Sequence, residues 1–232
     1  MIGVFDSGSG GERTARIIRS AAPLADLALL TDRENSPFGR RTEDELIGIT
    51  EAGINRLRDA GCERVLIACC TASTVHPMLK SEAREISLPI IMPTAKAAAE
   101  LSESGRIAVI ATEATVRSHA FSDILEDVCA SEIEASELVD LIESGNTDTS
   151  AARVYLGALA QRIADSGADV LILGCTHFGL VKDRLEAEVK KIIKRKIKTV
   201  DSAETGAREI LKLTRTDGSG ATVRIETKKE RN

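Results

Sequence analysis

The sequence predicts an α/β fold of two similar three-layer domains, each with a mainly parallel central sheet, that face each other in pseudo-symmetry across a cleft. Short apolar segments alternate with helical segments along the whole chain, as is typical of parallel sheets covered by helices. The segment 170–177 repeats the segment 65–72, since each is an apolar run that ends in a thiol and a threonine. The same offset of 105 residues relates the segments 2–7 and 107–112, so we expect two like halves with the active site in the cleft between them.

This repeat also predicts how the chain divides. Residues 1–95 should form an N-terminal domain that residues 206–232 complete, and residues 96–205 should form a second domain. With 232 residues and 43% hydrophobic content, the chain is long and apolar enough to bury a core.

The charge balance excludes several classes of partner. The formal net charge is −5, and basic and acidic residues are interspersed, so the protein should attract neither nucleic acid nor an anionic membrane. No apolar stretch approaches the roughly 20 residues of a membrane-spanning helix, and the chain enters its first strand without a basic leader or a cleavage site. We therefore expect a cytoplasmic protein whose partner is a small molecule.

The first expected element is a buried strand at residues 2–5, followed by a loop at 6–11 with three glycines and two serines. Such a loop lets backbone N–H groups approach a ligand. The segment 42–61 begins with Thr42 and Glu45, a pair typical of a helix N-terminus, and carries apolar residues at helical spacing. The other elements expected in the first half are strands at 27–30, 64–68 and 88–93 and helices at 12–21, 74–86 and 95–102.

The second half repeats this alternation. A strand at 106–111 opens it, a turn at 145–148 precedes a long helix at 150–167, and a strand at 169–173 leads into Cys175. The other elements expected here are strands at 132–135, 198–200 and 221–227 and helices at 116–128, 181–191 and 203–214, and residues 228–232 should fray.

Five cysteines in a chain without a secretory signal indicate free thiols rather than a disulfide framework. Cys62 and Cys129 lie where helix ends or turns are expected, and a cysteine in such a place is typically a small buried hydrophobe. Cys69, Cys70 and Cys175 differ because they end apolar runs.

These three cysteines do not match a metal site. A structural zinc site usually has two C-x2-4-C pairs, whereas Cys69 is followed directly by Cys70, and Cys175 is accompanied only by His177. Adjacent side chains of a strand also point to opposite faces of the sheet. We therefore expect no metal.

The carboxyl ends of the predicted strands gather reactive residues. Ligands of open α/β sheets bind at these ends, which here hold Asp6, Ser7 and the segments 69–71 and 175–177. Two like halves that face each other would bring one thiol from each half to a shared cleft. Such thiols could take a proton from one face of a carbon and return one to the other face, which inverts the carbon without a cofactor.

Five motifs follow one another along the chain: IGVFDSGSGG, SPFG, ACCTAS, ATEATVRSHAF and LGCTHF, at residues 2–11, 36–39, 68–73, 111–121 and 173–178. Together and in this order, they resemble the motifs of the glutamate racemase family within the aspartate/glutamate racemase superfamily. The resemblance extends to about Leu213. It implies a cofactor-independent isomerase that converts L-glutamate to D-glutamate for peptidoglycan, and it implies a homodimer.

The resemblance also implies the roles of individual residues. The family's two cysteines fall on Cys69 and Cys175, of which one takes the α-proton and the other delivers one. Asp6 would assist the first thiol and His177 the second, with Glu137 as an acidic helper. The residues that would hold the substrate are Ser7, Pro37, Phe38, Gly39, Cys70, Thr71, Thr112, Thr115 and Thr176.

Cys70 is the chief departure from the family pattern, because the family has there an Asn that contacts substrate. A thiol offers one weak donor, whereas an amide offers two strong donors and an acceptor. Two questions stay open: which amino acid is the substrate, and whether Cys69 or Cys70 is the first base, since the 105-residue offset pairs Cys175 with Cys70. The alternatives are a racemase for aspartate, another amino acid or a hydantoin, a related decarboxylase, and a non-catalytic binding or regulatory relative.

The proposed chemistry requires activated thiols. A free thiol has a pKa of roughly 8.5 and is only a few per cent ionised at neutral pH. Both thiol-bearing turns lead into predicted helices, whose N-termini favour a thiolate. A carboxylate at Asp6 would raise the pKa of a nearby thiol, so we expect Asp6 to accept or orient a proton instead.

Overall fold

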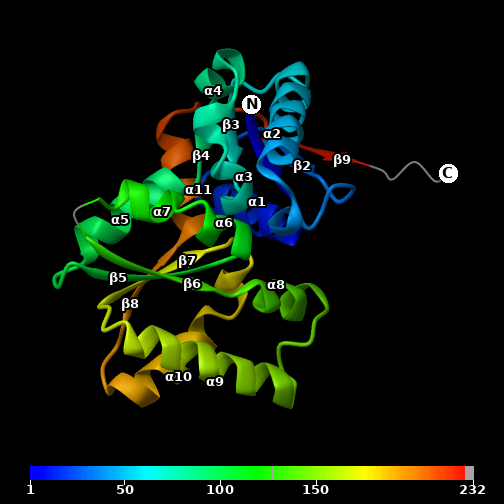
Figure 1. Ribbon diagram of the computed structural model, residues 1–232. Coiled ribbons are helices and arrows are strands. Elements are labelled where there is room, and N and C mark those ends of the chain that lie inside the picture. Colours follow the sequence, from blue (N-terminus) through cyan, green and yellow to red (C-terminus); the bar gives the residue numbers. More distant parts are fainter. Residues whose placement is uncertain (127, 228–232) are drawn as a thin grey trace.

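Two parallel sheets carry the fold in the computed structural model, which describes residues 1–126 and 128–227 (Figure 1). The first sheet consists of β1 (Ile2–Asp6), β2 (Leu27–Thr31), β3 (Arg64–Ile67), β4 (Ser87–Pro89) and β9 (Thr222–Glu226). The second consists of β5 (Arg106–Ala111), β6 (Cys129–Glu134), β7 (Val170–Gly174) and β8 (Lys198–Asp201). Every pairing within them is parallel.

The two sheets share one topology. Their strand orders are β4-β3-β1-β2-β9 and β6-β5-β7-β8. In each half the first strand therefore lies between the second and the third, and the fourth lies beyond the third. This finding confirms the predicted α/β fold with two similar halves, and β9 is an addition to the first half.

Helices cover both faces of the sheets, and Figure 1 shows the first half above the second, with α9 (Ser150–Asp165) and α10 (Lys182–Ile193) below the second sheet. The α-helices are α1 (Ser9–Ala21), α2 (Glu43–Asp59), α3 (Cys70–Ser73), α4 (Ser81–Ile86), α5 (Ile91–Leu101), α6 (Glu113–Arg117), α7 (Ala120–Ile124), α8 (Ser136–Glu143), α9 (Ser150–Asp165), α10 (Lys182–Ile193) and α11 (Ser202–Lys212). Three short 3-10 helices are η1 (Phe38–Arg40), η2 (His76–Met78) and η3 (Phe178–Leu180).

One apolar core lies between the two sheets. Ile2 and Val4 of β1 pack in the same cluster as Val109 of β5, together with residues of α1, α5, α7 and α11. Because side chains alternate along a strand, Phe5 points instead into a core beneath α2, and Ile110 points into a core beneath α9 and α10. The two halves thus share a central helical layer and each has an outer one.

The segment 88–93 is a strand only in part. β4 ends at Pro89, and α5 begins at Ile91 and includes Pro93 in its first turn. Proline is tolerated there because the N–H groups of a first helical turn have no intrahelical partner. The strand prediction was therefore wrong for the last residues of this segment.

Two predicted helices are interrupted. The segment 74–86 contains the 3-10 turn η2 before α4, and Pro77 disfavours a helical conformation of the residue that precedes it. The segment 116–128 is divided between α6 and α7 at His119, whose φ of 54° is left-handed and cannot continue a right-handed helix.

Three further expectations concern boundaries. Cys129 begins β6 and does not lie at a helix end. The expected domain boundary after residue 95 falls inside α5, and the division at residues 95 and 206 stays a prediction. The expectation that residues 228–232 fray lies outside the described residues.

The sheet register corrects the 105-residue offset. Phe5 of β1 pairs with Ile67 of β3, and Ile110 of β5 pairs with Leu173 of β7. Cys69 follows Ile67 by two residues, and Cys175 follows Leu173 by two residues. At the level of the sheets Cys175 is therefore equivalent to Cys69, whereas the gapless offset pairs it with Cys70.

Two glycines of α2 provide a test of this packing. An added Cβ at exposed Gly48 would meet no described atom within 4 Å, so Gly48→Ala should raise the free energy of unfolding by about 1 kcal/mol. At Gly53 it would lie 2.4–2.8 Å from ring atoms of Phe5, so Gly53→Ala should lower that free energy by about 1–3 kcal/mol. Urea denaturation measures both, and changes of the same sign would contradict the packing of α2 on β1.

Candidate active site

The carboxyl ends of four strands meet between the two halves. β1 ends at Asp6, β3 is followed by Cys69, β5 by Thr112 and β7 by Cys175. The two halves touch here, because the Thr176 hydroxyl donates a hydrogen bond to Oδ2 of Asp6 at 3.2 Å. The structure thus brings together residues that lie far apart in the sequence.

Cys69 lies beside Ser7 and Asp6. Its Sγ is 3.7 Å from the Ser7 hydroxyl, and the residue is only 8% exposed. Burial, followed by the charges of Asp6 and Cys175, raises the pKa of the Cys69 thiol to about 12, although hydrogen bonds from Ala72 and Ser7 lower it. The effect of Asp6 has the direction expected for like charges. The Cys69 thiol is therefore neutral at pH 7 in this closed arrangement.

Cys70 occupies a different environment from Cys69. It packs in the core between the sheets, whereas Cys69 packs in the core beneath α2. Burial raises the pKa of Cys70 well above its ordinary value, and the charge of Cys175 raises it further. Both thiols thus need a change in their surroundings before they can ionise.

The second thiol has a basic partner. Sγ of Cys175 lies 3.4 Å from Nδ1 of His177, and Nε2 of the same ring lies 2.5 Å from Oε1 of Glu143 in α8. Burial lowers the pKa of His177, but Cys175, Glu143 and Asp6 outweigh it and raise the pKa well above its ordinary value. His177 thus places a positive charge beside Sγ of Cys175.

Asp6 is completely buried. Its Oδ1 accepts the backbone N–H of Gly8 at 2.8 Å, and its Oδ2 accepts the Thr176 hydroxyl. Burial raises the pKa of Asp6 above its ordinary value, although His177 and these hydrogen bonds lower it. A carboxyl group with a raised pKa exchanges a proton more readily near neutral pH, which suits a proton acceptor.

Three threonine hydroxyls form a closed ring across the cleft. Oγ1 of Thr71 lies 2.9 Å from that of Thr112 and 3.2 Å from that of Thr115, and the last two are 3.0 Å apart. All three residues are buried. Because each hydroxyl has one hydrogen to donate, a ring of three can use every donor internally. A bound carboxylate would have to exchange these hydrogen bonds for its own.

The glycine-rich loop after β1 admits side chains of the other half. A Cβ added at Gly10 would lie 2.0 Å from Oγ1 of Thr176, and one added at Gly8 would lie 3.1 Å from Oε1 of Glu143. Any larger residue at position 10 would therefore hold the halves apart. The sequence predicted this loop as an approach route for a ligand, and in the structure it is also the contact between the halves.

The segment 37–39 lies only in part against the other predicted site residues. Phe38 is buried in the first half, where its ring centroid lies 6.0 Å from that of Phe5, and Pro37 is exposed. Gly39 lies beside Thr112 of the other half, since an added Cβ would be 3.5 Å from Cβ of Thr112. Of the three residues, Gly39 is the one that the structure places against another predicted site residue.

Glu137, expected as the acidic helper, is exposed in the first turn of α8. Glu143 in the last turn of the same helix makes the contact with His177 instead. Sequence reasoning missed Glu143 and its other partner, Ser9, because the contacts join residues 34 and 134 positions apart. No local pattern distinguishes Glu143 from other surface glutamates.

Two features are absent from the described residues, 1–126 and 128–227. No group of three or more His, Cys, Asp or Glu residues there is arranged to hold a metal ion. No helix in the same ranges is long and apolar enough to cross a membrane.

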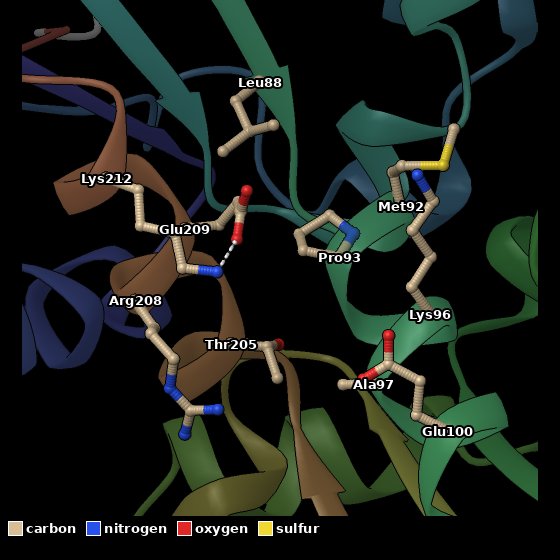
Figure 2. Close-up of a pocket in the computed structure, with 10 residues that line it drawn as sticks. All are labelled: Leu88, Met92, Pro93, Lys96, Ala97, Glu100, Thr205, Arg208, Glu209 and Lys212. Atoms are coloured by element: carbon tan, nitrogen blue, oxygen red, sulfur yellow. Dashed lines mark hydrogen bonds and ion pairs between the residues drawn. The ribbon is translucent and has the colours of Figure 1, made fainter.

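A surface pocket of about 330 Å³ lies away from the thiols, between α5 and α11 (Figure 2). Lys212 forms an ion pair with Glu209 at 2.8 Å on its wall. The pocket contains none of the residues predicted for the site; its lining is Leu88, Met92, Pro93, Lys96, Ala97, Glu100, Thr205, Arg208, Glu209 and Lys212.

Comparison with known proteins agrees with the geometry. The family model described as Asp/Glu/Hydantoin racemase matches residues 2–210. The glutamate racemase of Deinococcus radiodurans is 33% identical over 193 residues, which cover 81% of this chain and 67% of the relative. That of Koribacter versatilis is 34% identical over 220 residues, 91% of this chain and 74% of the relative. A solved glutamate racemase isoform of Bacillus anthracis has a TM-score of 0.86 at 26% identity and covers 98% of this chain and 88% of its own.

The contact between His177 and Glu143 predicts a stability that depends on pH. The hydrogen bond from His177 lowers the pKa of Glu143 to about 2, so this contribution is complete above the unfolded value of about 4.3 and is lost as the pH falls towards 2. The pKa of His177 is raised, so its contribution is complete below the unfolded value of about 6.5 and is lost as the pH rises through the raised pKa.

Thermal unfolding of Glu143→Gln should therefore differ most from that of the unmodified protein between about pH 4.5 and 6.5. The midpoint should be lower by about 2–4 °C, the shift that about 1 kcal/mol produces in a chain of this size. A difference that stays constant across the pH range would contradict the ion pair.

Proposed function

Since this chain belongs to the Asp/Glu/Hydantoin racemase family, we propose that it racemises glutamate with the two thiols of Cys69 and Cys175. It is an amino-acid racemase, an isomerase, like its glutamate racemase relatives. One observation carries the assignment of the thiols. The sheet register makes Cys69 and Cys175 equivalent, and they follow central strands whose carboxyl ends face each other.

The proposed reaction moves one proton on each side of the substrate. The thiolate of one cysteine removes the α-proton and becomes a thiol, and the electron pair of the broken bond stays on Cα. The thiol of the other cysteine then gives its proton to the opposite face and becomes a thiolate. The opposite enantiomer uses the same two groups in exchanged roles.

The neighbours of each thiol would manage these protons. Asp6 and Ser7 lie beside Cys69, and the raised pKa of Asp6 suits it to accept a proton. His177 lies beside Cys175 and would stabilise its thiolate, while Glu143 takes the place that we expected for Glu137.

The threonine ring is the proposed site for a substrate carboxylate. When Thr71, Thr112 and Thr115 release one another, three hydroxyls become free to donate to one anion. The other proposed substrate contacts are those expected from the sequence, at Ser7, Pro37, Phe38, Gly39, Cys70 and Thr176.

Cys70 favours a second candidate, a racemase with altered specificity for another acidic amino acid. Its thiol packs in the core between the sheets and offers a substrate fewer hydrogen bonds than an amide would. Comparison of glutamate with aspartate in the exchange assay described below separates the two candidates.

The cellular setting is also part of the proposal. We infer a cytoplasmic enzyme that supplies D-glutamate for peptidoglycan and acts as a homodimer. Membership of the family supports the supply of D-glutamate, and sedimentation of the purified chain tests whether it forms a homodimer.

The decisive test of the reaction is the uptake of deuterium. In heavy water, each enantiomer of glutamate should exchange its α-proton in the presence of the purified protein and approach an equal mixture, because enantiomers have equal free energies. Proton NMR of Cα–H and chiral chromatography measure the two processes. If neither glutamate nor aspartate exchanges, the proposed function is wrong.

Substitution of the thiols tests their roles. Cys69→Ser and Cys175→Ser should each lower racemisation by at least about a hundredfold, because a hydroxyl is a far weaker acid than a thiol. Cys70→Ser is the comparison variant; because its hydroxyl can still contact a substrate, it should lower racemisation by no more than about tenfold. An active Cys69→Ser together with an inactive Cys70→Ser would show that Cys70 is the base.

A further inference from the structure

We propose that Ser9 is a positioning residue for the second thiol, which it reaches from the opposite half of the protein. By holding Glu143, Ser9 holds His177 and thereby sets the arrangement of Cys175. This inference rests on the proposed function, because it concerns the same reaction.

Ser9 is the first residue of α1, and it contacts the carboxylate of Glu143 twice. Its hydroxyl donates to Oε1 at 2.7 Å, and its backbone N–H donates to the same oxygen at 3.2 Å. Nε2 of His177 lies 2.5 Å from that oxygen as well. One carboxylate oxygen thus joins two donors of the first half to the imidazole of the second half.

Glu143 needs such an anchor because its side chain is 46% exposed. A long side chain at the surface loses conformational entropy when it is fixed in one position. The two donors of Ser9 and the positive end of α1 offset this loss. Gly8 leaves room for the contact, because a Cβ there would lie 3.1 Å from Oε1 of Glu143 and 3.3 Å from Nε2 of His177.

The contact depends on closure of the cleft. Ser9 and Glu143 are 134 residues apart and lie in different halves, so separation of the halves breaks both hydrogen bonds. Glu143 can then turn towards solvent and release His177. The groups that would still face His177 are Asp6 from β1 and Cys175 after β7. Ser9 therefore links closure around a substrate to the preparation of Cys175.

Three substitutions at one position test this link. Ser9→Ala removes the hydroxyl, and Ser9→Val and Ser9→Thr form a pair of equal shape in which only threonine keeps it. The pKa of His177 can be followed by NMR of its ring, since the chain has three histidines and a His177→Gln spectrum assigns the signal. The pKa should fall by roughly half a unit to one unit in the alanine and valine variants and stay near the original value in the threonine variant.

Racemisation should follow the same pattern. The alanine and valine variants should lose roughly tenfold in kcat, and the limb of the pH profile that reports His177 should move to lower pH. The threonine variant should retain the activity. Because enantiomers have equal free energies, kcat/KM must fall by the same factor in both directions, which provides an internal check of the assay.

Two results would overturn the inference. One is an unchanged His177 pKa and an unchanged rate in both the alanine and the valine variants, and the other is an equal loss in the valine and threonine variants, which would assign the effect to shape. If the unmodified protein exchanges no α-proton of glutamate, the proposed function fails instead, and the NMR titration still decides whether Ser9 positions His177.

Discussion

The core between the two sheets is the constraint on which the site depends. Val4 of the first sheet and Val109 of the second pack in one cluster with the central helices, so the sheets cannot be placed independently. Their carboxyl ends are thereby held against each other, where Asp6 meets Thr176 and Thr71 meets Thr112. The shared core therefore fixes which strand ends of the two halves lie next to each other.

The halves repeat each other in topology but not in electrostatics. Cys69 is buried beside the carboxyl group of Asp6, and burial followed by the charge of Asp6 raises the pKa of its thiol. Cys175 instead has an imidazole beside it that a carboxylate holds in place. A pair that moves one proton in and one proton out needs this asymmetry, because one sulfur must carry the proton while the other lacks it. The repeated fold places the two cysteines at equivalent positions, and the different residues in the loops around them give the two sulfurs different surroundings.

Much of this arrangement could be predicted from the sequence because it follows from local patterns. Alternation of apolar runs and helices identified the parallel sheets, and the position of Cys69 and Cys175 after strands placed them at one edge. The one-residue error in the repeat arose because the connection from β1 to β3 differs in length from that between β5 and β7. Glu143 could not be found, since its partners are brought to it only by tertiary packing.

The threonine ring gives the proposed substrate site a property of its own. Its three buried hydroxyls satisfy one another within the protein and do not rely on solvent. A carboxylate that binds there would replace the hydrogen bonds between the threonines with its own. The net free energy of that exchange is small compared with the strength of the individual bonds. If the ring holds a substrate carboxylate as proposed, both enantiomers would bind weakly and leave readily. For a reaction whose substrate and product have equal free energies, tight retention of either would only slow turnover.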